Sequence, residues 1–188
     1  MELKTTNPQI YLISGKARHG KDTTALFVRE YCENNGKKVI NLQFSSYIKE
    51  YAKKISDWDG SEESKPRELL QVLGTDVIRK RIDEFFFIKK IIDDIKVYSY
   101  FFDVITISDV RVKNEIISIK EVFPYAKSIN IFRPNFDNGL TSEQKKHYTE
   151  IDLDDFLEFD IKLINDGTLE DLKNKIKNML GGEFNEKN

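Results

Sequence analysis

Short runs of apolar, mostly β-branched residues alternate along the chain with longer stretches in which apolar residues recur every three or four positions. We interpret the short runs as β-strands, because their length and β-branched content favour strands over buried helices. They lie at residues 9–13, 38–42, 104–107, 128–132 and 161–164. Strands separated by helices need crossover connections, so the pattern predicts an α/β fold with a five-stranded, mainly parallel sheet covered by helices on both faces.

The stretches between these strands predict helices. One follows the first strand over residues 21–34. From Thr75 onward, a single apolar stripe recurs every three or four residues, which predicts one long helix. The stripe consists of Ile78, Ile82, Phe85, Ile88, Ile92 and Ile95.

The last helix is expected to begin at Thr168, because Asp171 lies at the spacing of a capping box. Gly181 and Gly182 are expected to end this helix, with residues 181–188 as a flexible tail. Its buried face should contain Leu169, Leu172, Ile176 and Met179.

Composition supports one ordinary globular domain, which we place at residues 1–180. The chain has 188 residues, of which 39% are hydrophobic; this length fits one domain with room for an inserted lid. Its 30 basic and 32 acidic residues give a net charge of −2, which argues against nucleic acid as a partner and against a polybasic membrane binder. No apolar run approaches the roughly 18 residues of a membrane span, and the N-terminus has no apolar signal core. We therefore expect a cytoplasmic protein.

The single cysteine, Cys32, excludes an intramolecular disulfide and a cysteine-rich zinc site. We expect it to be a buried, small apolar residue of the first helix. With only two histidines, His19 and His147, a histidine-based metal site is disfavoured.

A phosphate-binding loop is expected after the first strand. The spacing is Gly, four residues, then Gly-Lys, with a strand before it and a helix after it. Glycines let backbone N–H groups turn inward around phosphate oxygens, and the helix N-terminus adds a positive dipole end. Lys21 would reach the β- and γ-phosphates. The candidate nucleotide-binding residues are Gly15, Lys16, Ala17, Arg18, His19, Gly20, Lys21, Asp22, Thr23 and Thr24.

Asp22 departs from the common form of this loop, in which Ser or Thr follows the lysine and its hydroxyl binds Mg²⁺. A carboxylate at this position can still bind Mg²⁺, directly or through water, because Mg²⁺ favours oxygen ligands and keeps several waters. Alternatively, Asp22 only stabilises the first turn of the helix, where an anion is favourable.

In parallel α/β sheets, ligands bind beyond the carboxyl ends of the strands, so the residues that follow each strand are candidates for the chemistry. After the second strand, Phe44 and Lys49 suit a nucleobase or sugar pocket, although Phe44 could equally belong to the core. Further along, Arg67 and Gln71 share one helix face and could bind a phosphate and a base edge. A solvated face of an amphipathic helix is the alternative.

The third strand ends near Asp109, two residues before Arg111. An acid at the tip of an apolar strand beside a phosphate loop can hold Mg²⁺ through water or position an acceptor. Arg111 could clamp the phosphate of the acceptor. An aspartate at a strand end is common by itself. An arginine two residues after it, opposite a phosphate loop, is an independent observation that favours a phosphate-binding site.

The fourth strand is followed by a charged, turn-rich insert from about residue 133 to 160, which we interpret as a mobile lid. Arg133 lies at its root and could touch phosphate. His147 and Glu150 are interpreted mainly as contacts that structure the lid.

The fifth strand ends in a turn that contains Asn165 and Gly167. In this architecture the turn lies beside the phosphate loop, so its backbone and Asn165 could read the edge of the donor adenine. A simple turn with Thr168 as helix cap is compatible with the same residues.

Taken in order, these motifs resemble the deoxynucleoside monophosphate kinases of bacteriophage type, within the adenylate-kinase-like phosphate-loop kinases. The resemblance rests first on the loop and its Gly-Lys-Asp-Thr ending at residues 20–23. Val112 and the pair Tyr148 and Thr149 depart from the family pattern, at positions that bear on base choice or lid contacts. Supporting segments extend over about residues 10–180: Phe44 to Lys49, Arg67 with Leu70 and Gln71, Gly74 to Asp76, Asp109 to Arg111 with Asn114 and Glu115, Arg133 with Pro134, His147 to Glu150, and Asn165 to Thr168.

The resemblance implies a three-layer P-loop NTPase fold and ATP-dependent phosphorylation of deoxynucleoside monophosphates to diphosphates with Mg²⁺. It also implies a homodimer, an acceptor-binding helical region at about residues 45–100 and a lid at about 133–160. The candidate metal ligands are Asp22 and Asp109. The candidate catalytic residues are Lys21, Asp109, Arg111 and Arg133. The candidate acceptor-binding residues are Phe44, Lys49, Arg67, Gln71, Arg79, Arg111, Glu115 and Glu150.

Other functions stay open at this point. A related kinase could act on a phosphomevalonate-like or dephospho-coenzyme-A-like acceptor, or on a modified base within DNA, although the near-neutral charge disfavours DNA. The chain could also be a catalytically silent nucleotide-binding module. The sequence has no Asn-Lys-x-Asp guanine motif and no Asp-x-x-Gly switch at Asp109, which argues against a GTPase switch.

Overall fold

Five strands form one sheet in the computed structural model, which describes residues 4–185. They are β1 (Gln9–Ser14), β2 (Val39–Leu42), β3 (Val104–Val110), β4 (Lys127–Phe132) and β5 (Ile161–Ile164). Their order across the sheet is β2-β3-β1-β4-β5, and every pairing within the described residues is parallel. The predicted strands are thus confirmed, and β1, which leads into the phosphate loop, lies in the centre of the sheet.

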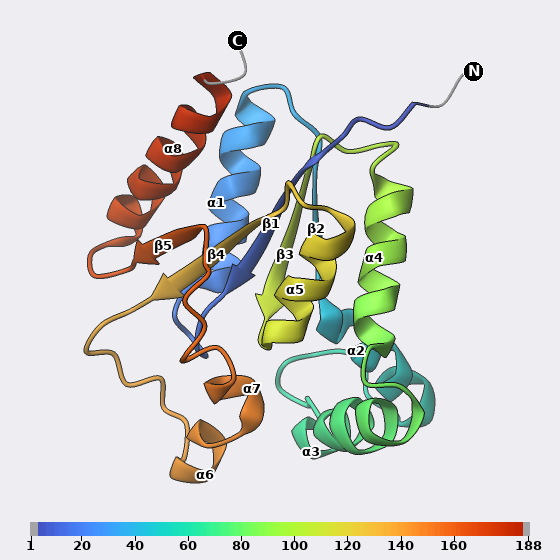
Figure 1. The fold of residues 1–188 in the computed structure, drawn as a ribbon. Coiled ribbons are helices and arrows are strands. Elements are labelled where there is room, and N and C mark those ends of the chain that lie inside the picture. The colour runs from blue at the N-terminus through green and yellow to red at the C-terminus, as the bar shows by residue number, and fades with distance from the viewer. Residues whose placement is uncertain (1–3, 186–188) are drawn as a thin grey trace.

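The sheet has a hydrophobic core on each face, because successive strand residues point to opposite sides. Ile10 and Leu12 belong to the core under α4 (Phe86–Tyr98) and α5 (Lys113–Val122), whereas Tyr11 and Ile13 belong to the core under α1 (Lys21–Asn34) and α8 (Leu169–Asn185). Helices α1 and α8 cover one face and α4 and α5 the other (Figure 1). The three-layer α/β fold is therefore observed, and Cys32 is fully buried in it as expected.

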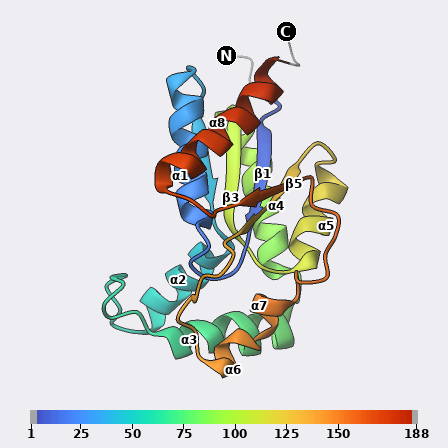
Figure 2. The same cartoon turned by 90° about the vertical axis from the view of Figure 1, so that its left-hand side faces the viewer.

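The connection from β2 to β3 forms a helical region beyond the carboxyl ends of the strands. It contains α2 (Phe44–Ile55), α3 (Arg67–Gln71) and the π-helical segment η1 (Val72–Ile82), after which α4 returns along the face of the sheet. In the side view α2 and α3 lie below the sheet, next to α6 (Ser142–Lys145) and α7 (Tyr148–Ile151) (Figure 2). These two short helices belong to residues 133–160, the segment that the sequence predicts as a lid and that we call the lid. The helical region is therefore placed to cover a ligand that binds at the sheet edge.

The prediction of one long helix after Thr75 is wrong, because the helix is interrupted between η1 and α4. Asp83 has extended backbone angles, and its carboxylate accepts a hydrogen bond from the Phe85 N–H at 2.9 Å and pairs with Lys89 at 2.6 Å. These local bonds compete with helix continuation. Ile82 is left 66% exposed. The buried residues of α4 are Phe87, Ile88, Ile91 and Ile95.

The last helix begins as predicted at the capping box. The Asp171 carboxylate accepts a hydrogen bond from the Thr168 N–H at 2.8 Å, and the Thr168 hydroxyl accepts one from the Asp171 N–H at 3.2 Å. Leu172 and Ile176 are buried as expected, whereas Leu169 is 67% exposed, which contradicts the prediction for that residue.

The prediction that Gly181 and Gly182 end this helix is also wrong, since α8 continues to Asn185. Neither glycine has a positive φ, and glycine inside a helix costs only about 1 kcal/mol. Residues 186–188 of the predicted tail lie outside the described residues. Within residues 4–185, no helix combines the length and the apolar character that crossing a membrane requires.

Residues 133–160 leave the end of β4 and return to the start of β5, with two short helices, α6 (Ser142–Lys145) and α7 (Tyr148–Ile151). Both helices lie beyond the carboxyl edge of the sheet (Figure 1). Asp160 fixes the return, because its carboxylate accepts hydrogen bonds from the Ser128 N–H at 2.6 Å and hydroxyl at 2.7 Å and pairs with Lys120 at 2.6 Å.

Candidate active site

The phosphate loop curls between β1 and α1 with backbone angles that favour glycine. Gly15 has φ 148° and Gly20 has φ 107°, and Arg18 between them has φ 60°. A Cβ on Gly15 would lie 2.5 Å from the carbonyl oxygen of Ile131, so only glycine fits at this position. The loop leads directly into the N-terminus of α1, where backbone N–H groups and the helix dipole favour an anion.

Lys21 lies inside the curl of the loop. Its ammonium donates to the carbonyl oxygens of Gly15 and Lys16, each at 2.9 Å, and the residue is 7% exposed. Burial, and then the neighbouring charge of Arg111, lower the pKa of Lys21 to about 8. A cation that has already lost most of its water interacts strongly with an arriving phosphate, because the local dielectric constant is low.

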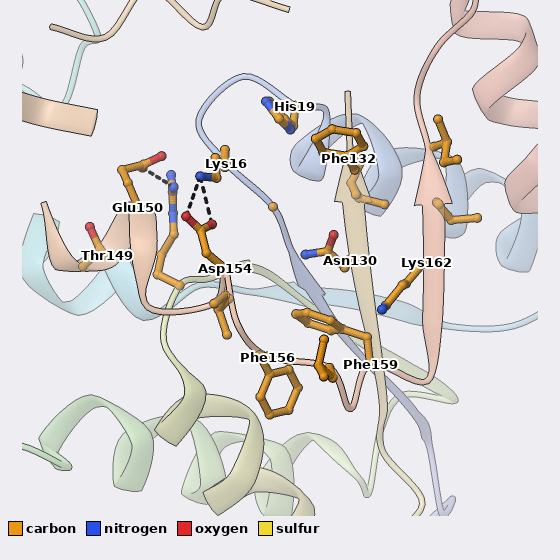
Figure 3. A pocket seen from close by; sticks show the side chains of 17 residues that line it. Lys16, His19, Asn130, Phe132, Thr149, Glu150, Asp154, Phe156, Phe159 and Lys162 are labelled. Atoms are coloured by element: carbon orange, nitrogen blue, oxygen red, sulfur yellow. Dashed lines mark hydrogen bonds and ion pairs between the residues drawn. The ribbon is translucent and has the colours of Figure 1, made fainter. Parts of the chain in front are cut away.

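The lid lies directly against the loop (Figure 3). The Arg111 guanidinium forms an ion pair with Glu150, and the second oxygen of Glu150 accepts a hydrogen bond from the Ala17 N–H at 3.2 Å. Lys16 pairs with Asp154 at 2.9 Å. The lid therefore places two carboxylates among the cationic and N–H groups that the sequence assigns to phosphate.

Asp22, in the first turn of α1, has one carboxylate oxygen that is free of hydrogen bonds within the described residues. Its Oδ1 accepts hydrogen bonds from the Ser108 hydroxyl at 3.1 Å and from the Gln43 amide at 3.3 Å, whereas Oδ2 has no hydrogen-bond partner among the described residues. A free carboxylate oxygen fits Mg²⁺, which completes its shell with water and phosphate oxygens. Residues 4–185 contain no group of three or more His, Cys, Asp or Glu that could hold a metal, so a metal here would depend on Asp22 and the nucleotide.

Asp109 follows Ser108 on β3, where the pairing with β1 has a register shift. Its two carboxylate oxygens accept hydrogen bonds from the backbone N–H groups of Phe44 and Ser45, each at 2.9 Å. Asp109 thus caps the start of α2. Each oxygen keeps one lone pair that can accept a further hydrogen bond.

A cavity of about 740 Å³ lies between η1, α4, α5 and the lid helix α7. Three predicted acceptor-binding residues, Gln71, Arg79 and Glu115, line it. The Arg79 guanidinium pairs with Glu115 at 3.3 Å and lies over the ring of Phe87 at 5.0 Å. This cavity is the structural candidate for the acceptor.

Glu115 is 2% exposed and connects the cavity to Arg111. Its carboxylate accepts hydrogen bonds from the backbone N–H of Arg111 at 2.7 Å and of Val112 at 3.2 Å. Burial raises the pKa of Glu115 to about 7, against the opposing effect of these N–H groups and Arg79. The same side chain therefore caps α5 and holds the backbone that carries Arg111.

Five other predicted acceptor-binding residues do not line this cavity, and two of them, Arg111 and Glu150, line a separate cavity beside the phosphate loop. Phe44 is 3% exposed and belongs to the core, which is the alternative that the sequence left open. The Arg67 side chain is 71% exposed and pairs with Glu62 at 3.0 Å. Lys49 lies on α2 and does not line the cavity either.

Arg133 and Asn165, which follow β4 and β5, both contact His19 of the loop. His19 is 4% exposed, and its Nδ1 accepts a hydrogen bond from the Arg133 N–H at 3.1 Å. Burial, followed by the charge of Lys21, lowers the pKa of His19. The Arg133 guanidinium lies 3.9 Å from the centre of the Phe136 ring, and the Asn165 amide donates to the His19 carbonyl oxygen at 3.0 Å. The turn after β5 thus contacts the loop, as predicted.

A second cavity of about 510 Å³ lies between the loop, the ends of β4 and β5, and the returning part of the lid (Figure 3). Phe132, Phe156 and Phe159 line it together with Asn130 and Lys162. Five residues that the sequence predicted for the site also line it, namely Gly15, Lys16, His19, Arg111 and Glu150. Phe156 and Phe159 were not predicted, because they come from an irregular segment.

Sequence reasoning also missed Ser108, Gln43 and Asp154. Ser108 interrupts the apolar strand just before Asp109, and this interruption is the only trace of it in the pattern. Gln43 and Asp154 lie next to predicted elements but belong to no motif, so only the fold brings them to the loop.

Comparison with known proteins points to one kinase family. A family model described as deoxynucleotide monophosphate kinase matches residues 29–176. The deoxynucleotide monophosphate kinase of Enterobacteria phage T4 is 29% identical over 150 residues, which cover 79% of this chain and 56% of the phage protein. The chain thus spans little more than half the length of that relative.

Solved structures agree on the fold. The APS kinase of Mycobacterium tuberculosis in complex with AMPPNP and APS is similar with a TM-score of 0.55 at 10% identity, over 93% of this chain and 98% of that one. Shikimate kinase from Aquifex aeolicus is similar with a TM-score of 0.51 at 18% identity, over 93% and 97%. At these identities the likeness concerns the fold alone.

Proposed function

The chain belongs to the deoxynucleotide monophosphate kinase family, and on this premise we propose that it transfers the γ-phosphoryl group of ATP to a deoxynucleoside 5′-monophosphate, forming the diphosphate and ADP. The observation that carries the proposal is the position of Arg111. Its charge lies close enough to lower the pKa of Lys21 in the phosphate loop, and the next residue, Val112, lines the acceptor cavity. Donor and acceptor phosphates would therefore meet between Lys21 and Arg111.

The reaction needs no strong general base, because the attacking phosphate oxygen is already anionic at neutral pH. Rate enhancement would come from in-line positioning and from neutralisation of phosphate charge. Lys21 and the N–H groups of residues 15–24 would hold the donor phosphates, and Arg111 would clamp the acceptor phosphate. Arg133, at the root of the lid, would add positive charge when the lid closes over the nucleotides and excludes water.

Mg²⁺ is the metal that we propose for the site, because it neutralises and orients the phosphates of ATP when bound. Asp22 would hold it through its free oxygen, and Asp109 would accept a hydrogen bond from one of its waters. This division follows from the hydrogen bonds of the two carboxylates, since only Asp22 keeps an oxygen without a partner.

The nucleosides would occupy the two sides of the loop. Gln71 and Arg79 line the cavity in which we place the acceptor base and sugar, and closure of the helical region would bring Lys49 and Arg67 toward its phosphate. On the other side, Asn165 and the backbone near Gly167 would flank the donor adenine.

The family relationship also bears on the metabolic role, the location and the oligomeric state of the protein. We propose an enzyme of deoxynucleotide metabolism that acts in the cytoplasm, as a homodimer, on small-molecule nucleotides. A soluble location is compatible with the absence of membrane-spanning helices within residues 4–185.

A coupled assay of ADP release tests the function, with Mg²⁺ and ATP against each deoxy- and ribonucleoside monophosphate. We expect turnover with at least one deoxynucleotide and slower turnover with its ribonucleotide. Turnover only with a phosphomevalonate-like or dephospho-coenzyme-A-like acceptor, or only with DNA, would identify a different kinase. ATP binding without turnover on any acceptor would leave a nucleotide-binding module.

A further inference from the structure

A line of polar side chains crosses the face of β2 and β3 that α1 covers, and it ends on Asp22. Thr106 donates a hydrogen bond to the Asn41 amide oxygen at 2.8 Å, and the Asn41 amide nitrogen donates to the Ser108 hydroxyl at 3.1 Å. The Ser108 hydroxyl donates to Asp22 Oδ1 at 3.1 Å. Thr106 and Ser108 are fully buried. We call Asn41, Gln43, Thr106 and Ser108 the polar ladder.

Ser108 determines which groups donate and which accept along the polar ladder. A serine hydroxyl has one hydrogen and two lone pairs. Both lone pairs are used, because Ser108 Oγ accepts from the amides of Asn41 and Gln43, each at 3.1 Å. The single hydrogen is therefore directed to Asp22 Oδ1. The Gln43 amide reaches the same oxygen at 3.3 Å, so two donors converge on one oxygen of Asp22.

This convergence fixes the orientation of an otherwise exposed side chain. A serine or threonine in this position of a phosphate loop presents one oxygen, whereas an aspartate can rotate its two oxygens about the last side-chain bond. Two donors on Oδ1 restrict that rotation and leave Oδ2 without a hydrogen-bond partner among the described residues, so that Oδ2 can bind a cation. Burying the hydroxyls of Thr106 and Ser108 costs free energy unless each is hydrogen-bonded. The hydroxyl hydrogen of Ser108 finds its acceptor in Asp22.

We propose that Ser108 and Gln43 are positioning residues that aim the free oxygen of Asp22 at the divalent cation of the bound nucleotide. The inference rests on the proposed function in one respect, the presence of a metal–nucleotide complex at the loop. Removal of such outer partners of a metal ligand changes metal affinity by about 10- to 100-fold in other metal sites.

The experiment measures Mn²⁺ binding to the enzyme–ATP complex by electron paramagnetic resonance, and ATP binding in EDTA by calorimetry. Ser108→Ala and Gln43→Met should each weaken Mn²⁺ binding by about 10-fold or more and leave the ATP affinity in EDTA unchanged. Ser14→Ala is the matched control, because Ser14 is also fully buried but donates to the Ile129 carbonyl oxygen instead. It should change neither affinity.

Unchanged Mn²⁺ affinity in both ladder variants, together with a loss in Asp22→Asn, would overturn the positioning role and keep Asp22 as a metal ligand. An equal loss of ATP affinity in EDTA would mean that the ladder supports the loop itself, and would also overturn the proposal. Gln43 is only partly buried, so Gln43→Met carries the test if Ser108→Ala does not fold. A wild-type protein that binds no ATP would instead refute the proposed function.

Discussion

The carboxylate of Glu150 accepts a hydrogen bond from the backbone N–H of Ala17 at 3.2 Å. Glu150 belongs to the lid and Ala17 to the phosphate loop, and the other oxygen of Glu150 pairs with Arg111. A carboxylate of the chain thus occupies two of the donors that the proposed function assigns to phosphates. If the proposed function holds, a nucleotide that enters the site would have to displace this carboxylate.

We expect Glu150→Gln to bind ATP more tightly than the wild type, by about fivefold or more, because the competing negative charge is removed. Calorimetric titration with ATP in the presence of Mg²⁺ measures the change. Asp155→Asn is the control, since Asp155 is a carboxylate of the same segment that pairs with Lys113 at 2.7 Å and with no described residue of the phosphate loop; its ATP affinity should change little. Weaker binding by Glu150→Gln would mean that Glu150 supports Arg111 rather than competing with phosphate.

Lys21→Ala should lower kcat by about 100-fold or more, a loss of at least ~2.7 kcal/mol of transition-state stabilisation. The reason is that Lys21 is a buried cation held by two loop carbonyls, where the proposed function places the donor phosphates. Steady-state kinetics with the best acceptor provide the measurement, and Lys177→Ala, on the exposed side of α8, is the control. Near-normal turnover in Lys21→Ala would refute its assignment.

The buried carboxyl of Glu115 should make stability depend on pH. Its pKa rises from 4.5 to about 7 in the fold because of burial, so the native state binds more protons than the unfolded chain between these values. Stability from this group therefore falls as the pH rises from about 4.5 to 7. Urea unfolding at several pH values should show that the free energy of unfolding of the wild type falls over this range relative to that of Glu115→Gln. If the wild type instead gains stability relative to the variant as the pH rises, the ion pair with Arg79 dominates over burial.

Two tyrosines offer a matched test of buried hydroxyl groups. The Tyr148 hydroxyl is buried without a hydrogen-bond partner among the described residues, whereas the Tyr47 hydroxyl donates to Asp94. An unpaired buried polar group costs about 1–3 kcal/mol, so Tyr148→Phe should raise the free energy of unfolding, and Tyr47→Phe should lower it. Urea unfolding measures both, and equal destabilisation by the two variants would contradict the assignment of Tyr148.

The strands and the phosphate loop could be predicted because their signals are local. An apolar run such as Ile10 to Ile13 has no alternative to burial, and the glycine and lysine spacing of the loop lies within the consecutive residues 15–21. The break at Asp83 could not be predicted, because Ile82 and Phe85 continue the helical period across it. Only the hydrogen bonds of Asp83 to its own neighbours end the helix.

In the candidate site, too, residues with a local sequence signal could be predicted, and residues that depend on the tertiary fold could not. Arg111 was predicted because it follows a strand, and the carboxyl ends of parallel strands meet at one edge. Arg67 has the right chemistry, but its exposure depends on how α3 lies over the sheet, which no local pattern encodes. Ser108 lies 86 positions from Asp22 along the chain, so their hydrogen bond exists only after β3 and α1 have packed together.

Gly15 and Gly182 should respond in opposite ways to the same added methyl group. In Gly15→Ala the new Cβ would lie 2.5 Å from the Ile131 carbonyl oxygen, at a φ of +148°, so the loop has to deform, and such strain costs about 1–3 kcal/mol. In Gly182→Ala the Cβ enters open space in α8, and alanine should stabilise the helix by up to about 1 kcal/mol. Urea unfolding measures both changes, and calorimetry with ATP should find binding lost only in Gly15→Ala. If Gly15→Ala binds ATP as the wild type does, the nucleotide phosphates do not lie in this loop.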